Sequence, residues 1–79
     1  MEYDKDKVDQ MVLALLYLTS STDQYATRTW KGLDSGVLNR LHEKGYIGDP
    51  KGKGPTVDLS EDGASLSKEL FFQYFGIRE

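Results

Sequence analysis

The side chains that could carry out catalysis are few in this sequence. His42 is the only histidine, and nucleophilic catalysis would need a base and an orienting group beside a nucleophile such as Ser35 or Ser60. The spacing of these serines relative to His42 gives no such set. A metal site would need His42 and carboxylates at a ligand spacing of two or three residues, and the sequence has none. We therefore expect no enzyme activity, no cofactor and no metal site.

Amide and basic side chains in the middle of the chain have the chemistry for nucleic-acid contact. Asn39 and Arg40 are of the types that form paired hydrogen bonds with adenine and guanine edges. Lys51 and Lys53 flank Gly52 in a segment rich in glycine and proline, where they could contact phosphates. Asn39 and Arg40 could equally belong to an ordinary solvated helix face. Judged from this helix alone, that interpretation is favoured over base contact. A plain surface loop is an equal alternative for the second pair.

Charge is distributed unevenly along the chain. Residues 24–56 contain six Lys and Arg against three Asp and Glu. Residues 1–23 and 57–79 each contain two basic residues against five acidic residues. A basic middle third between acidic ends indicates a surface that could meet phosphates, although three net charges are a weak signal.

The composition favours a soluble, cytoplasmic protein. The chain has no cysteine, which fits a reducing compartment. The apolar run Met11–Leu18 has eight residues, whereas a membrane-spanning helix needs about 20. Acidic residues stand before this run where a signal peptide would have basic ones. We expect no membrane association.

The 79 residues are expected to form a single domain, residues 1–79, that starts with a helix over about residues 4–19. Asp4 can cap this helix, and one apolar face follows the helical spacing. That face consists of Val8, Met11, Val12, Leu15 and Leu16. Residues 25–31 then predict either a short strand or a single turn. Trp30 within them is expected to pack into the core, with ligand stacking as the alternative.

A second helix is expected over about residues 34–44, followed by a β-wing over about 46–59. Asp34 can cap the helix, and Gly45 stands where a left-handed residue commonly ends one. Its buried side should be Val37, Leu38 and Leu41. The alternation in Thr56–Leu59 predicts a strand that returns from the glycine- and proline-rich loop.

The last helix is expected over about residues 60–75, with Ser60 as its cap. Four aromatic residues near its end cannot all face one way, so some must lie outside the apolar stripe. They either enlarge a thin core or form a dimer surface with the first helix, and both interpretations stand equally. The candidate dimer residues are Leu13, Tyr17, Phe71, Phe72, Tyr74 and Phe75.

These elements predict an α+β, mostly helical, winged-helix-like fold with three main helices and a two- or three-stranded β-wing. Residues 37–66 resemble the recognition helix, wing and following helix of MarR- and PadR-type winged helix-turn-helix regulators. The segments Glu43–Ile47 and Leu59–Gly63 carry the resemblance, since these families share E-K-G-[LYW]-I and L-[ST]-x-x-G there. The element before the second helix is abbreviated. The whole chain also resembles a group of short uncharacterised bacterial proteins.

The resemblance implies a DNA-binding transcriptional regulator that acts as a dimer on double-stranded DNA. By motif position it implies base contacts from Ser35, Asn39 and Arg40, and phosphate contacts from Lys51 and Lys53. The alternative is a winged-helix module that binds a second copy of itself or another protein without binding DNA. The acidic ends of the chain favour that alternative.

Overall fold

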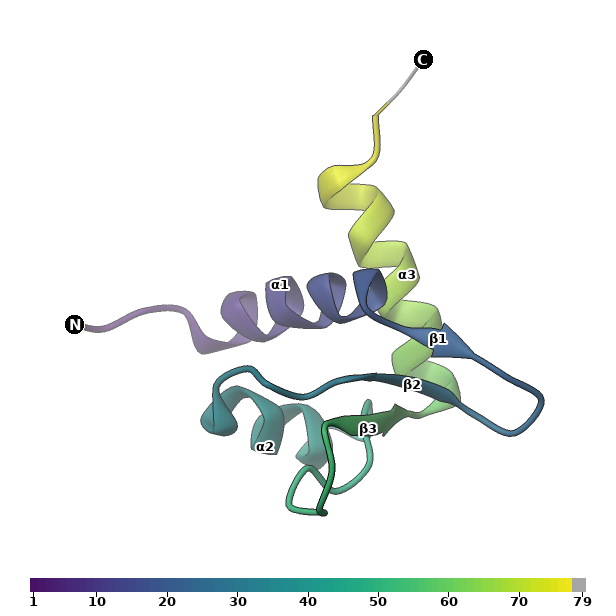
Figure 1. The fold of residues 1–79 in the computed structure, drawn as a ribbon. Coiled ribbons are helices and arrows are strands. Elements are labelled where there is room, and N and C mark those ends of the chain that lie inside the picture. The colour runs from purple at the N-terminus through teal and green to yellow at the C-terminus, as the bar shows by residue number, and fades with distance from the viewer. Residues whose placement is uncertain (78–79) are drawn as a thin grey trace.

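The computed structural model describes residues 1–77, which fold into three helices and one three-stranded antiparallel sheet (Figure 1). The expected α+β class is therefore confirmed. The helices are α1 (Lys5–Leu18), α2 (Ser35–Glu43) and α3 (Glu61–Phe75). The strands are β1 (Ser21–Thr22), β2 (Thr27–Trp30) and β3 (Thr56–Leu59). Residues 25–31 thus contain a strand, and β1 is an additional strand that the sequence did not predict.

Each helix begins directly after the residue that was expected to cap it. Asp4, Asp34 and Ser60 accept hydrogen bonds from backbone N–H groups in the first turns of α1, α2 and α3. At the other end of α2, Gly45 has a φ of +82°, and Tyr46 N donates to the Leu41 carbonyl oxygen. This is the expected glycine-based helix end, in which the chain reverses and leaves the helix.

The sheet has the order β1-β2-β3, and both of its pairings are antiparallel. β3 pairs with β2, with Trp30 opposite Thr56 and Thr27 opposite Leu59. The residues just after α2 supply only an isolated bridge, Ile47 with Leu59. The wing expected over 46–59, with two or three strands, therefore has β2 as the main partner of its return strand, and residues 48–55 are a loop.

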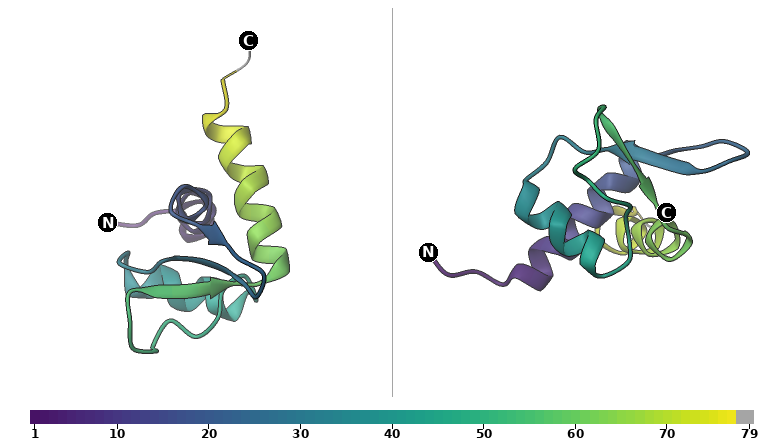
Figure 2. Two further views of the ribbon diagram at one scale, coloured as in Figure 1. Left: turned by 45° about the vertical axis from the view of Figure 1, so that its right-hand side comes forward. Right: turned by 90° about the horizontal axis from the view of Figure 1, so that it is seen from below.

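The core lies between α1, α2, α3 and the inner face of the sheet (Figure 2). The second helix buries Val37, Leu38 and Leu41 as expected. In α1 the buried apolar residues are Leu13, Ala14 and Leu16, whereas Leu15 is 44% exposed. The expected apolar face of α1 is therefore rotated: its Leu16 side faces the core, and its Leu15 side faces solvent.

Trp30 is a correction to the sequence-based expectation, because its side chain does not enter the core. It is 48% exposed on the outer face of the sheet. Its ring lies against Gly32, where an added Cβ would stand 1.9 Å from Trp30 Cζ2. The buried residue of β2 is its neighbour Thr29, whose hydroxyl donates to the Leu16 carbonyl oxygen at 2.7 Å. The period-two alternation of the strand therefore turns Trp30 outward.

Candidate functional site

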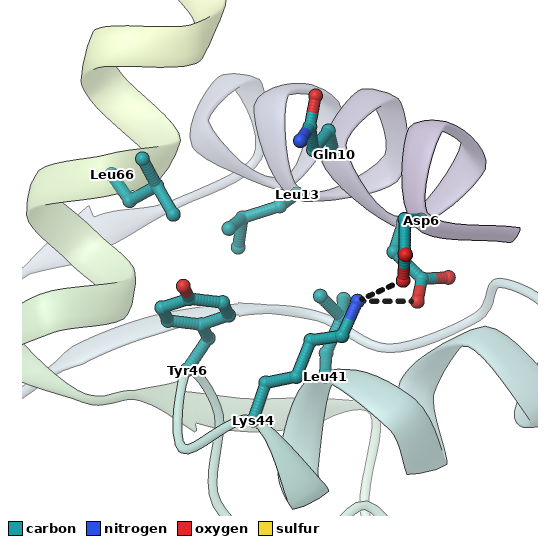
Figure 3. A pocket seen from close by; sticks show the side chains of 8 residues that line it. Asp6, Gln10, Leu13, Leu41, Lys44, Tyr46 and Leu66 are labelled. Atoms are coloured by element: carbon teal, nitrogen blue, oxygen red, sulfur yellow. Dashed lines mark hydrogen bonds and ion pairs between the residues drawn. The ribbon is translucent and has the colours of Figure 1, made fainter.

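A buried carboxylate ties α1 to α2. The Asp9 side chain is 1% exposed and lies between two cations of α2 and its C-cap. Arg40 Nε stands 3.0 and 2.9 Å from the two Asp9 oxygens, and a terminal Arg40 nitrogen stands 2.8 Å from Oδ1. Lys44 Nζ is 3.0 Å from Asp9 and 3.1 Å from Asp6 (Figure 3). Every oxygen of the buried group is thus hydrogen-bonded to a cation.

This pairing alters the acidity of all three groups. Burial raises the pKa of Asp9, but hydrogen bonds from Arg40 and Lys44 outweigh burial and hold that pKa below its ordinary value. The hydrogen bonds to Asp9 in turn raise the pKa values of Arg40 and Lys44. All three groups are therefore charged at neutral pH, and the cluster is a structural clamp between two helices.

A small pocket of about 280 Å³ lies beside the clamp. Its apolar wall is formed by Leu13, Leu41 and Leu66, one from each helix (Figure 3). Lys44 and Asp6 stand at its edge and are already paired with each other. The charges at this pocket therefore satisfy one another and single out no ligand.

Arg40 does not lie where the helical wheel of the sequence placed it. The helical wheel predicted that Arg40 lies on the solvent side of the second helix. In the structure its guanidinium group faces α1 and donates hydrogen bonds to Asp9. The spacing of Arg40 and Lys44 was a usable signal, because residues four apart share one side of a helix. Asp9, the residue that both cations bind, was missed because a single acidic residue in α1 resembles any other solvated one.

Three of the other residues predicted for DNA contact lie together. Ser35, Asn39 and Lys51 line one hollow of about 340 Å³ between the start of α2 and the loop 48–55. Lys31 also lines it and donates from Nζ to the carbonyl oxygens of Pro50, at 3.1 Å, and Gly52. Lys53 is exposed in the same loop but is not part of that lining.

His42 is exposed at the end of α2 and is hydrogen-bonded to the backbone that follows the helix. Its Nδ1 is 3.1 Å from the carbonyl oxygen of Ile47, which can only accept a hydrogen bond. Within residues 1–77, no group of three or more His, Cys, Asp or Glu side chains is placed to hold a metal ion. No helix in the same range has the length and apolar character needed to cross a membrane.

The residues expected at a dimer surface divide into two groups. Leu13 is a correction: it is 1% exposed, and α1 turns it into the core, out of reach of a second chain. The other five, all aromatic, form one cluster at the contact of α1 with α3. Its ring centroids are 5.3 Å apart for Tyr17 and Phe71 and 5.9 Å apart for Tyr17 and Phe72.

The outer part of this cluster is open to solvent. Phe72, Tyr74 and Phe75 are exposed, whereas Tyr17 and Phe71 are partly covered. Leu15 and Leu18 on α1 are also exposed, as is Ile77 after α3. We call these exposed residues the apolar surface: Leu15, Leu18, Phe72, Tyr74, Phe75 and Ile77. Sequence reasoning missed Leu15, Leu18 and Ile77, because Leu15 was assigned to the core and the others were left unassigned.

Fold and surface together define a small α+β domain in which three helices pack on an antiparallel sheet and leave an apolar surface open. The chain belongs to a domain family of unknown function, DUF6429, whose model matches residues 4–77. It is 45% identical over 75 residues to the uncharacterized protein y4hR of Sinorhizobium fredii (strain NBRC 101917 / NGR234). That match covers 95% of this chain and 97% of the relative. The resemblance to a group of short bacterial proteins is thereby confirmed. No solved structure matches the chain.

Proposed function

We propose that this protein is a protein-interaction module that binds its partner through the apolar surface of α1 and α3, and that it catalyses no reaction. The observation that carries the proposal is the exposure of six large apolar side chains on that surface. Large exposed apolar side chains gathered on a few elements are typical of interaction sites in soluble proteins. Aromatic side chains are also enriched among the residues that dominate interface energetics.

The electrostatics of α2 support this choice over DNA binding as the main function. Arg40 and Lys44 are bound to carboxylates of α1, so both cations are largely neutralised within the fold. Glu43 is exposed at the end of the same helix, and its charge would repel a phosphate backbone. What remains for a polyanion is a small basic area around Lys31, Lys51 and Lys53.

Site-specific photocrosslinking in living cells tests the proposal. A benzoylphenylalanine in place of Phe72 changes an exposed aromatic residue of the apolar surface into a crosslinker, and the exposure of Phe72 leaves room for the added ring. The matched control carries it in place of Tyr25, which is 81% exposed in the turn between β1 and β2. We expect ultraviolet-dependent protein adducts from position 72 and few from position 25. Equal adducts at both positions, or none at 72, would contradict the proposal.

A second candidate function is binding of double-stranded DNA through α2 and the loop 48–55. The observation in its favour is that Ser35, Asn39 and Lys51 line a single hollow. The resemblance of residues 37–66 to MarR- and PadR-type regulators also supports it. In this arrangement Asn39 would contact bases while Lys51 and Lys53 contact phosphates.

Fluorescence anisotropy with labelled duplex DNA separates the two functions. If DNA is the ligand, affinity should fall at least about tenfold between roughly 50 and 200 mM salt, because phosphate contacts release counterions. Changing both Lys51→Ala and Lys53→Ala should lower the salt slope by about 2. The control variant, Lys5→Ala with Lys68→Ala, removes the same charge elsewhere. No binding at about 50 mM salt, or equal slopes for both double variants, would exclude the DNA function.

A further inference from the structure

Two exposed features of α3 and α1 have opposite shapes, and the second shares only Leu15 with the apolar surface. One is a ridge formed by the end of α3, which projects past α1 on the side away from α2 and the sheet (Figures 1 and 2). The other is a hollow of about 370 Å³ on the exposed side of α1. We infer that the partner of this surface is a second copy of the chain, with the α3 ridge of each copy seated in the α1 hollow of the other. This inference rests on the proposed function.

The α1 hollow has the composition of a site for an apolar side chain. Its walls are formed by Val8, Met11, Val12 and Leu15, with Asp4 and Lys7 at its edge. Val8 and Val12 are also packed against the core, so the floor of the hollow is held in place from below. Interfaces concentrate their binding energy where an aromatic anchor fills such a fixed pocket.

The α3 ridge supplies aromatic anchors of that kind. Phe72 is 55% exposed and Phe75 is 46% exposed. Their rings are held by neighbours, with Phe75 5.3 Å from Phe71 and Phe72 5.9 Å from Tyr17 between ring centroids. Because these contacts already restrict the rings, little side-chain entropy remains to be lost when a partner binds.

The exposed area approaches what a dimer needs from each chain. The surface has three aromatic side chains, which offer roughly 150–250 Å² each when fully exposed, and three smaller aliphatic ones. With exposures of 37% to 91%, they leave on the order of 600 Å² of mostly apolar area open. The largest apolar patch on a typical monomer is roughly 300–600 Å². A standard protein interface buries roughly 800 Å² per partner, polar edge included. The apolar surface therefore reaches the upper end for a monomer and approaches one half of a dimer interface.

Charge adds a second point of complementarity between ridge and hollow. The C-terminal end of a helix carries partial negative charge and is stabilised by a nearby cation. The last turn of α3 contains no basic residue. Lys7 lines the α1 hollow together with Asp4, and in the inferred dimer we place Lys7 beside that helix end of the partner chain. A two-fold arrangement makes this contact twice and closes the assembly at two chains.

Sedimentation equilibrium of the full chain tests the inference. We expect twice the mass of one chain at about 100 μM, with a dissociation constant in the micromolar range. Phe75→Asp in the ridge and Met11→Asp in the hollow should each weaken association at least about 30-fold. Tyr25→Asp is the control for an added charge at an exposed position and should leave the dissociation constant unchanged. Circular dichroism of each variant verifies that the substitutions at exposed Phe75 and Tyr25 and at half-buried Met11 leave the fold intact.

Lys7→Glu provides a test that does not depend on apolar substitutions. It should weaken the dimer about tenfold at low salt and less at high salt, because the contact it reverses is electrostatic. A monomer at about 300 μM, or a dimer indifferent to Phe75→Asp and Met11→Asp, would overturn the inference. If the protein is a monomer that still crosslinks from position 72 to a different protein, the partner is not a second copy of the chain. The proposed function would then still hold. Absence of crosslinks from position 72 would remove the proposed function itself.

Discussion

At the scale of single residues, Asp9 has the most demanding position. The Asp9 side chain is buried, and its charge is balanced by two cations that come from α2 and its C-cap. A buried carboxylate without partners would be far more costly than an exposed one. The carboxylate and its partners therefore determine how α2 packs against α1. That packing in turn determines which face of α2 points outward.

Replacing Asp9→Asn should lower the free energy of unfolding by about 1–3 kcal/mol, because Arg40 and Lys44 lose their shared counterion while both can still reach water. Urea denaturation monitored by circular dichroism measures the change. Asp6→Asn is the matched control, since Asp6 also contacts Lys44 but its side chain is 83% exposed. Equal losses of unfolding free energy in Asp9→Asn and Asp6→Asn would contradict the prediction that the buried carboxylate contributes more.

Acid should weaken the same clamp. The pKa of Asp9 in the fold lies below its ordinary value, because the bonds from Arg40 and Lys44 outweigh the effect of burial. A carboxyl group with a lowered folded pKa stabilises the fold fully above its unfolded pKa, about 3.9, and loses that contribution as the pH falls through the folded pKa. The difference in unfolding free energy between wild type and Asp9→Asn should therefore shrink between about pH 5 and pH 2. A constant difference over this range would contradict the assignment.

Gly63 is a second residue with a strict requirement. A Cβ at this position would stand 1.9 Å from the carbonyl oxygen of Tyr46, which already accepts a hydrogen bond from Ser60 N. Gly63→Ala should therefore cost about 2–3 kcal/mol of unfolding free energy, since backbone on both sides must shift. Thermal unfolding of this variant beside Ser65→Ala, an exposed position in the same helix, measures the effect. A loss below that of Ser65→Ala would disprove the close contact.

The residue types predicted local backbone geometry well, but they predicted side-chain contacts between distant parts of the chain poorly. Asp4, Asp34, Ser60 and Gly45 act where their chemistry placed them, because capping depends on a few neighbouring residues. The Asp9 pairing joins residues 31 positions apart, and no local pattern encodes such a separation. Trp30 was assigned to the core because of its size, whereas the pairing of β2 with β3 decides which way it points.

At the scale of elements, the loop 48–55 is fixed by one side chain outside it. Lys31, which follows β2, donates to the carbonyl oxygens of Pro50 and Gly52 and so joins the strand to the loop. The sequence predicted the loop and its return strand but not this link, nor the pairing of β3 with β2. Both features depend on where β2 lies, and the sequence left residues 25–31 open between strand and turn.

Lys31→Met should free this loop without unfolding the domain, because the apolar part of the side chain is kept and only the ammonium group is lost. Amide hydrogen exchange over residues 50–54 should become faster, and exchange in α2 should remain unchanged. Lys51→Met is the control, since it changes a lysine within the loop whose ammonium has no such link to those carbonyls. Equal exchange profiles for wild type and Lys31→Met would contradict the link.

At the scale of the whole molecule, the arrangement of α1 and α3 determines what the protein offers to others. α1 packs on both other helices with one side and leaves Leu15 and Leu18 uncovered. α3 extends beyond the body and carries its aromatic residues with it (Figure 1). The sequence indicated a surplus of apolar residues in both helices. It could not separate core from surface, because helical periodicity gives the spacing of a face and not the element that covers it.

The inferred dimer depends on the contact between the α3 ridge of one chain and the α1 hollow of another. The sequence has no cysteine, so a designed pair reports this contact without background. Met11→Cys and Phe75→Cys are made in separate chains, and the two proteins are mixed under mild oxidation. The mixed dimer would bring one cysteine pair together while keeping the second, reciprocal contact unaltered.

We expect a disulfide-linked dimer to form in the mixture at least about tenfold faster than in either variant alone, because in each single variant the new cysteine faces a native side chain. Because a disulfide needs Cα atoms within roughly 7 Å, the rate reports the contact directly. Non-reducing electrophoresis over time measures it. Equal rates in the mixture and in the separate variants, or no linked dimer in any of them, would contradict the account.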